Sequence, residues 1–154
     1  MRAATVDDLA FLADAERVVF SDAWSASAIA SHIGASHNLS LVATLSGSPV
    51  GYLFAAVLPP EGELYRIAVL PAYRKNAVGR ALLSCFHDRL AESGVTRVFL
   101  EVRASNVAAV SLYRAFGYEG CGVRKRYYRD PIEDALLFSC DLPDEKSDKS
   151  DKKE

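Results

Sequence analysis

Cysteine is scarce in this sequence, and its few copies are widely separated. Cys85, Cys121 and Cys140 are odd in number and include no Cys-x-x-Cys pair. This pattern argues against both a disulfide framework and a cysteine metal site. We therefore expect free thiols in a reducing compartment, and no bound metal.

Long hydrophobic runs are also absent. The apolar segments are too short to cross a bilayer, and no basic stretch followed by an apolar one opens the chain. The net charge is only -2, so the overall charge favours neither nucleic acid nor an anionic membrane as a partner. These absences predict a cytoplasmic protein that binds no membrane and no nucleic acid directly.

Two common phosphate-binding motifs are missing as well. Without Gly-Lys-Ser/Thr there is no Walker loop, and without Gly-x-Gly-x-x-Gly there is no Rossmann fingerprint. The few histidines show no catalytic spacing, and we expect surface or capping roles for them: His32, His37 and His87.

What the chain does contain is enough for one domain with a substantial core. It has 154 residues, and half of them are hydrophobic. Residues 144–154 include no apolar side chain and carry mixed charge, so they cannot bury surface. We expect a single domain over residues 1–142 and a disordered charged tail over residues 143–154.

Apolar spacing predicts an alternating series of strands and helices. Helices are expected after the caps Thr5 and Ser25, over residues 78–90, and after Ser105 or Asn106. Strands are expected at residues 39–45, 50–58, 64–70, 95–102, 118–128 and 132–140. With a short first strand, the predicted order is β-α-α-β-β-β-α-β-α-β-β.

The most informative segment is the basic turn between residues 70 and 80. It joins a strand to a helix within a right-handed crossover between two parallel strands of a mixed sheet. Ligands bind beyond the carboxyl ends of such strands, and a helix N-terminus there suits a phosphate. The alternative is an ordinary helix N-terminus that follows a solvated basic turn.

This turn, Arg74-x-x-Ala77-x-Gly79, resembles the Gln/Arg-x-x-Gly-x-Gly/Ala motif of the GCN5-related N-acetyltransferase (GNAT) superfamily. Five further segments are similar to its RimI-type branch, the ribosomal-protein alanine N-alpha-acetyltransferases: Trp24-Ser25, Ile67-Ala68-Val69-x-Pro71, Leu100–Asn106, Ser111–Tyr118 and Arg124-x-x-Tyr127-Tyr128. The resemblance covers nearly all of residues 1–142. It implies an α/β fold with a central mixed, mostly antiparallel sheet, one parallel β-α-β unit and helices on both faces.

The resemblance also implies acetyl-CoA as cosubstrate. In the family, amides of the basic turn hold the pyrophosphate, which here implicates Arg74, Lys75, Asn76, Ala77, Val78, Gly79 and Arg80. Backbone groups of the preceding strand would hold the pantetheine arm, namely those of Ile67, Ala68 and Val69. Asn106 would contact CoA and also cap its helix.

Ala77 departs from the family motif, which has glycine at this position. With helical angles alanine costs nothing there, whereas a positive φ would add strain of about 1 kcal/mol or more. Because the residue stands at the start of a helix, we expect helical angles. Affinity for the cofactor is the property that this departure puts in doubt.

Acetyl transfer from a thioester to an amine needs a base for the ammonium, donors for the oxyanion and a proton for the thiolate. Glu101 ends an apolar strand, where a carboxylate contributes little to stability, and the resemblance assigns it as the proton acceptor, directly or through water. The resemblance assigns Tyr113 as the proton donor to the CoA sulfur. The alternatives are a structural carboxylate paired with Arg103 or Arg97, and a core tyrosine.

The resemblance locates the acceptor amine opposite CoA, near Trp24, Glu63, Tyr127 and Tyr128. Trp24 is either a lid or a hydrophobic staple at the next helix cap. Glu63 either attracts a basic N-terminal peptide or is a solvated charge at a strand end.

The expected function is acetyl transfer from acetyl-CoA to the N-terminal α-amine of a protein, in a ternary complex. An alanine-starting protein of the small ribosomal subunit is the expected partner, and the enzyme itself is expected to be a monomer or weak homodimer. Two alternatives stay open: acetylation of lysine or small amines, and a non-catalytic acyl-CoA sensor.

Overall fold

The structure, a computed structural model, describes residues 1–143. Its first half consists of β1 (Arg2–Ala3), a 3₁₀ turn η1 (Val6–Asp8), α1 (Leu9–Val19), α2 (Ala26–Gly34), β2 (Asn38–Leu45), β3 (Ser48–Leu58) and β4 (Glu61–Val69). Its second half consists of the 3₁₀ turn η2 (Pro71–Tyr73), α3 (Val78–Glu92), β5 (Arg97–Arg103), α4 (Val107–Ala115), β6 (Glu119–Tyr128) and β7 (Glu133–Asp141). This order of strands and α-helices agrees with the sequence prediction.

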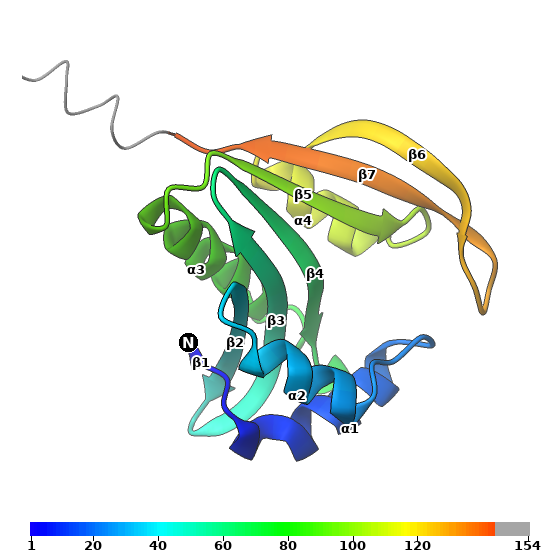
Figure 1. The fold of residues 1–154 in the computed structure, drawn as a ribbon. Helices are drawn as coiled ribbons and strands as arrows, with labels where there is room; N and C mark the ends of the chain where they lie inside the picture. The colour runs from blue at the N-terminus through cyan, green and yellow to red at the C-terminus, as the bar shows by residue number, and fades with distance from the viewer. Residues whose placement is uncertain (144–154) are drawn as a thin grey trace, which may run out of the picture.

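The strands form one seven-stranded sheet in the order β1-β2-β3-β4-β5-β7-β6 (Figure 1). β4 and β5 are parallel, and every other neighbouring pair is antiparallel. α3 connects the two parallel strands, which is the predicted crossover. The predicted mixed α/β fold is therefore confirmed.

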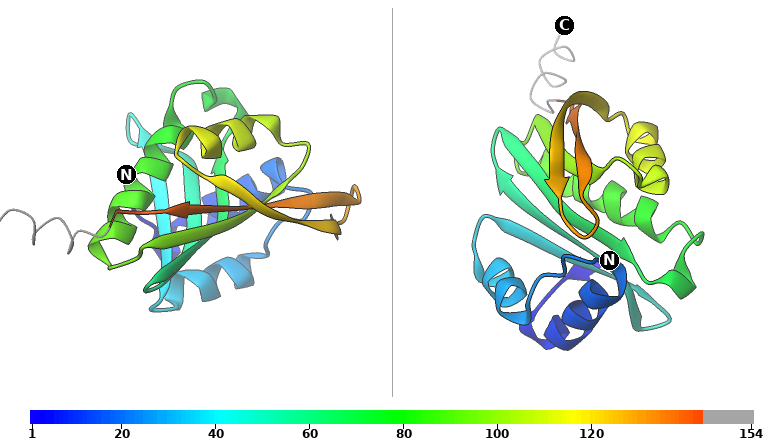
Figure 2. Two further views of the ribbon diagram at one scale, coloured as in Figure 1. Left: turned by 90° about the horizontal axis from the view of Figure 1, so that it is seen from above. Right: turned by 90° about the vertical axis from the view of Figure 1, so that its right-hand side faces the viewer.

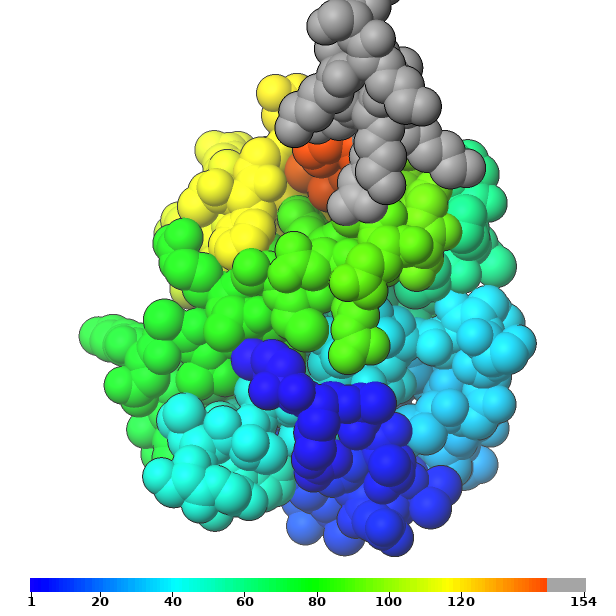
Figure 3. Space-filling view, turned by 90° about the vertical axis from the view of Figure 1, so that its left-hand side faces the viewer, coloured from blue at the N-terminus to red at the C-terminus, as the bar shows by residue number. Residues whose placement is uncertain are grey.

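Helices cover both faces of the sheet (Figure 2). The strand pattern explains why, since alternate residues of β2 contribute to two different cores. Val42 belongs to the cluster with Leu12 of α1 and Ile29 of α2, whereas Leu41 belongs to the cluster with Phe86 of α3. In the space-filling view of Figure 3, seen from the left of Figure 1, α3 (green) lies beside α4 (yellow).

The parallel strands separate towards their carboxyl ends. Only Glu61–Leu64 of β4 pairs with β5. Tyr65 is an extra residue in the pairing of β4 with β3, because Phe54 pairs with Arg66 and Ala55 with Leu64. Beyond this bulge β4 pairs with β3 along one edge, and its other edge is left for the site described below.

Side-chain caps fix where three helical segments begin. Thr5 forms a capping box with Asp8, and the Ser25 hydroxyl accepts a hydrogen bond from Ala28 N at 3.1 Å. At the start of α4 the sequence allowed two caps. The structure selects Asn106, whose Oδ1 accepts from Ala109 N at 3.2 Å.

The expected surface or capping role is wrong for His32, which is buried, whereas His87 is half-buried. His32 is buried, with Nε2 3.2 Å from the carbonyl oxygen of Leu39. His87 lies with Nε2 2.7 Å from the hydroxyl of Tyr118. Both rings pack in apolar surroundings, and burial lowers the pKa of each.

Four further predictions concern the cysteines, a metal site, a membrane span and the end of the chain. Over residues 1–143 the cysteines are free thiols, and no group of three or more His, Cys, Asp or Glu side chains could hold a metal ion. In the same range no helix is both long enough and apolar enough to cross a membrane. The predicted disordered tail lies, from residue 144 onwards, outside the described residues.

Candidate active site

A cavity of about 910 Å³ opens where β4 and β5 separate. Its walls come from both strands, the first turn of α3, the helix α4, and the loops that follow α1 and β6. Most of the candidate site residues line it: Ile67, Ala68, Val69, Arg74, Lys75, Ala77, Val78, Gly79, Arg80, Glu101, Asn106, Tyr113 and Tyr128. Four candidates are not among its lining residues: Trp24, Glu63, Asn76 and Tyr127.

The turn before α3 presents backbone donors and cations to this cavity. α3 begins at Val78, and the cap residue Ala77 has no side-chain acceptor for the N–H groups of the first turn. Arg74, Lys75 and Arg80 line the same end, and none of them takes part in an ion pair within the described range. Unpaired amides, a helix dipole and three cations together suit a phosphate group.

The backbone at Ala77 contradicts the prediction of helical angles. Its φ is 60° and its ψ is 17°, which is the left-handed conformation, and Lys75 also has a positive φ of 66°. These two residues reverse the chain between η2 and α3, and an alanine in this conformation is strained by about 1–2 kcal/mol. Glycine, the residue of the family motif, adopts these angles without strain.

Gly79 is not required by the packing of the protein itself. A Cβ built at this residue would lie 3.6 Å from Leu112 Cδ2 and 3.9 Å from Val69 Cγ2, which are ordinary contacts. Its backbone is not left-handed either. The missing side chain instead leaves the N-terminus of α3 open towards the cavity, so the chain here fits a phosphate-bearing cofactor.

β4 offers its unpaired edge along the cavity. Residues 65–69 line the cavity, and beyond Leu64 they make no ladder with β5. Val69 still pairs with Gly51 of β3, so the strand stays extended. Backbone N–H and C=O groups on this edge can therefore bind an extended ligand as a neighbouring strand would.

Glu101 reaches the cavity from β5. Its side chain is one-quarter exposed, and Oε1 lies 3.0 Å from Nε of Arg124 on β6. The Tyr127 phenol has a raised pKa, chiefly because of a side-chain hydrogen bond to Glu101. The partners suggested by the sequence, Arg103 and Arg97, pair with other carboxylates.

Tyr113 reaches the same cavity from α4. Only 5% of the residue is exposed, and burial raises the pKa of its phenol far above the ordinary value. The phenol therefore keeps its proton at neutral pH, as a proton donor must. Asn106 also lines this wall, and because it caps α4 through its oxygen, its amide donors remain available.

Of the four residues expected on the acceptor side, only Tyr128 lines the cavity. Trp24 stacks on Phe54 with ring centroids 5.2 Å apart and planes 13° apart, which favours a packing role over a lid. Glu63 is exposed at the amino-terminal half of β4. The pKa of Glu63 is raised, first by partial desolvation of its carboxylate and then by the negative charge of Glu101.

The side chain of Asn76 makes a contact within the basic turn itself. Its side-chain amide donates to the carbonyl oxygen of Tyr73 at 3.2 Å and so braces the basic turn. Arg74 does the same from the other side, since its Nε donates to Val69 O at 3.1 Å.

Sequence reasoning missed an arginine that anchors the loop after α1. The Nε of Arg66 lies 3.3 Å from Oε1 of the fully buried Glu16, and its Nη2 donates to Asp22 O at 2.8 Å. Its Cζ also lies 4.2 Å from the centroid of the Phe20 ring. The available signal was Glu16 itself, a carboxylate at a position of α1 where helical spacing calls for an apolar residue.

A scan against protein families matches residues 9–118 to the Acetyltransferase (GNAT) family. The chain is 37% identical over 118 residues to the [ribosomal protein bS18]-alanine N-acetyltransferase of Escherichia coli K12, covering 75% of this chain and 79% of that protein. It is 38% identical over 135 residues to the N-alpha-acetyltransferase RimI of Mycobacterium tuberculosis, covering 85% and 84%.

A solved structure is also similar. The crystal structure of the ribosomal-protein-S18-alanine N-acetyltransferase from Escherichia coli superposes with a TM-score of 0.85 at 32% identity, covering 92% of both chains. The structure and the comparisons point to the same family. The sheet separates between β4 and β5, a basic turn precedes α3, and the matches extend over most of the chain. This chain belongs to the GNAT family and is an acetyltransferase.

Proposed function

We propose that this enzyme transfers acetyl from acetyl-CoA to the N-terminal α-amine of a protein, with an alanine-starting protein of the small ribosomal subunit as the favoured substrate. Transfer is direct, within a complex that holds both substrates. The supporting observation is that Glu101, Tyr113 and the N-terminus of α3 line one cavity. Both similar relatives described above carry names of N-terminal acetyltransferases, one of them specific for a ribosomal protein alanine.

Two groups of residues bind two different parts of the cosubstrate. The amides at the start of α3, with Arg74, Lys75 and Arg80, hold the pyrophosphate of acetyl-CoA, and the edge of β4 over residues 67–69 holds the pantetheine arm. Acetyl-CoA supplies an acetyl group activated as a thioester. In the basic turn Asn76 supports the geometry rather than the charge.

Glu101 and Tyr113 perform the proton transfers. Glu101 accepts a proton from the ammonium of the acceptor, directly or through water, so that the amine becomes nucleophilic. A backbone N–H on the edge of β4 stabilises the negative charge that develops on the acetyl oxygen. Tyr113, protonated at neutral pH, donates its proton to the leaving sulfur.

The charges around the cavity are consistent with a cationic acceptor. Arg74 and Lys75 lie at the cofactor end. The other side is lined by three carboxylates, Asp22, Glu101 and Asp130, and by two arginines, Arg66 and Arg103. Because the carboxylates outnumber the arginines there, an α-ammonium is favoured on that side. Tyr128 lines the cavity on the same side and supplies an aromatic surface for the peptide.

The test is an end-group assay. The purified enzyme is incubated with acetyl-CoA and a basic peptide that begins with alanine, and the acetylated end is located by mass spectrometry. The same peptide with a blocked N-terminus and a free lysine, and a panel of small amines, are assayed in parallel. The proposal requires acetylation of the free α-amine at a rate above that of the lysine. Faster acetylation of lysine or of a small amine would reassign the acceptor.

Two substitutions test the proton transfers. Glu101→Gln and Tyr113→Phe should each lower kcat by roughly 10²–10⁴. Tyr118→Phe is the matched control for the second, because Tyr118 is a buried tyrosine with its ring centroid 5.7 Å from that of Tyr113 but does not line the cavity. An unchanged kcat in Glu101→Gln or Tyr113→Phe, or an equal loss in Tyr118→Phe, would remove the assigned role.

A further inference from the structure

Arg103, the last residue of β5, contacts the turn that joins β6 to β7. Its Nη1 donates to Pro131 O at 3.0 Å, and its Nη2 donates to Arg129 O at 2.8 Å. Nη1 also lies 3.4 Å from Oε2 of Glu133, at the start of β7. The hairpin turn (residues 129–132) thus has two of its carbonyl groups fixed by one guanidinium.

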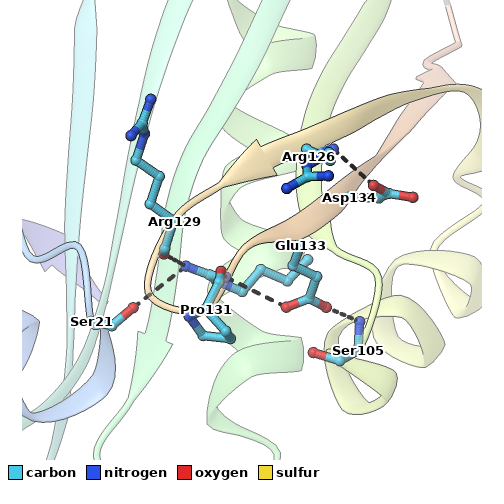
Figure 4. Close-up of polar contacts among 8 residues, drawn as sticks. Ser21, Ser105, Arg126, Arg129, Pro131, Glu133 and Asp134 are labelled. Carbon is cyan, nitrogen blue, oxygen red and sulfur yellow. Dashed lines mark hydrogen bonds and ion pairs between the residues drawn. The ribbon is translucent and has the colours of Figure 1, made fainter.

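The same guanidinium also reaches the loop that follows α1, and its partner Glu133 contacts the turn before α4 (Figure 4). Nη2 lies 3.4 Å from the hydroxyl of Ser21, in the loop that follows α1. Glu133, on the opposite side, accepts a hydrogen bond from the backbone N–H of Ser105 in the turn before α4. Arg103 therefore links three loops that are far apart in the sequence.

Tyr128 completes this arrangement. The Cζ of Arg103 lies 4.5 Å from the centroid of the Tyr128 ring, within the range of a cation–π contact. Tyr128, Ser21 and Arg103 all line the cavity, together with Asp130 and Pro131 of the hairpin turn. Three of the residues that Arg103 contacts, Ser21, Tyr128 and Pro131, therefore belong to the cavity wall.

Arg97, at the other end of β5, provides a comparison. It also pairs with a carboxylate of β7, Asp141, at 3.4 Å, and its Cζ lies 5.5 Å from the Phe99 ring. It contacts no loop of the cavity and does not line it. The two arginines therefore lie on the same strand, and each pairs with a carboxylate of β7 and contacts an aromatic ring. They differ because only Arg103 holds loops of the cavity wall in place.

We propose that Arg103 is a positioning residue, which holds the hairpin turn and the loop after α1 together and so shapes the acceptor side of the cavity. This inference rests on the proposed acetyl transfer to an amine. The planar guanidinium is needed because it donates in several directions at once, which a lysine ammonium on a flexible chain does not reproduce. Arg103 acts on the acceptor through the loops that it holds, without taking part in the proton transfers.

Steady-state kinetics separates this role from catalysis. In Arg103→Ala we expect the KM for the alanine-starting peptide to rise about tenfold, with kcat and the dissociation constant of CoA changed by less than about twofold, as expected when only acceptor binding is lost. Arg103→Lys should give a smaller rise, since it keeps the charge without the fork. Arg97→Ala should leave all three quantities within about twofold of the wild type.

Amide hydrogen exchange tests the same contacts without any substrate. Exchange over residues 126–133 should be faster in Arg103→Ala than in the wild type, and unchanged in Arg97→Ala. If Arg103→Ala does not fold, as judged by circular dichroism, Arg103→Lys decides the question with both measurements. Because exchange needs no turnover, a wild type that acetylates no amine would refute the proposed function and leave the exchange result to decide the role of Arg103.

Three results would overturn the proposal. The first is unchanged exchange of the hairpin turn in the Arg103 variants. The second is a loss of kcat or of CoA affinity with an unchanged KM for the peptide. The third is an equal effect of Arg97→Ala on both KM and exchange, because that would identify a general contribution of β5 to stability.

Discussion

The left-handed alanine in the basic turn leads to a prediction of increased stability for Ala77→Gly. At φ 60° and ψ 17°, alanine is strained by about 1–2 kcal/mol relative to glycine. Glycine also gains freedom in the unfolded chain, which offsets about 0.4–1 kcal/mol of that relief. The net expectation is a gain of about 0.5–1 kcal/mol, or roughly 1–4 °C in Tm for a domain of this size.

The same substitution should change CoA affinity little. The left-handed angles belong to the fold, because they join η2 to α3, so their cost is borne when the chain folds. Relief of that strain stabilises the protein whether or not the cofactor is bound, and leaves the binding constant within about threefold. The departure from the family motif at Ala77 therefore concerns stability more than affinity.

Lys75→Gly is the matched control for this reasoning. Lys75 has a similar φ of 66°, so its replacement relieves comparable strain, but it also removes a cation from the cofactor end of the cavity. We expect a similar gain in Tm together with weaker CoA binding. Tm is measured by scanning calorimetry without ligand, and affinity by titration calorimetry with CoA. A lower Tm in Ala77→Gly, or a change in its CoA affinity beyond tenfold, would refute the argument.

Three further predictions concern charge and pH. Burial raises the pKa of Glu16 from 4.5 to about 7, so the protonated side chain stabilises the fold fully below about pH 4.5, and this stabilisation is lost as the pH rises through 7. Between pH 5 and 8, the free energy of unfolding in urea should therefore fall by about 2–3 kcal/mol in the wild type relative to Glu16→Gln. Parallel plots of unfolding free energy against pH for the two proteins would contradict this. Arg74→Ala should weaken CoA binding about tenfold and reduce its dependence on salt, as titration at two ionic strengths would show. Because burial raises the pKa of Tyr113, kcat should not decline from its ionisation between pH 8 and 9.5, and a decline there that Tyr113→Phe abolishes would show that this pKa is not raised.

Most of the fold could be predicted because its signals are local. The caps Thr5, Ser25 and Asn106 open helical segments where expected, and Gly94 and Gly117, both at positive φ, follow α3 and α4. The short apolar runs of β2 and β3, separated by Gly47 and Pro49, indicated strands in the same way. These signals depend on neighbouring residues, so the sequence alone carries them.

The errors arise where distant contacts decide the outcome. The conformation of Ala77 follows from how η2 and α3 must be joined, which helix propensity does not describe. The partner of Glu101 is Arg124, a residue of β6, even though β7 separates β6 from β5 in the sheet. His32 was expected at the surface but is buried against β2. Its burial results from the packing of α2 on the sheet, which the sequence around His32 does not reveal.

The two ends of the cavity differ in how far apart in the sequence their contacting residues lie, and this difference affects specificity. At the cofactor end, the turn is braced by hydrogen bonds across five and three residues, from Arg74 and Asn76. At the acceptor end, the loop after α1 is held by Arg66 and Arg103 across 44 and 82 residues. A short motif can therefore specify the cofactor, whereas the acceptor wall depends on side chains from β4, β5 and the hairpin turn acting together. Acceptor preference can consequently change through substitutions at these anchors while the motif that binds the cofactor stays intact.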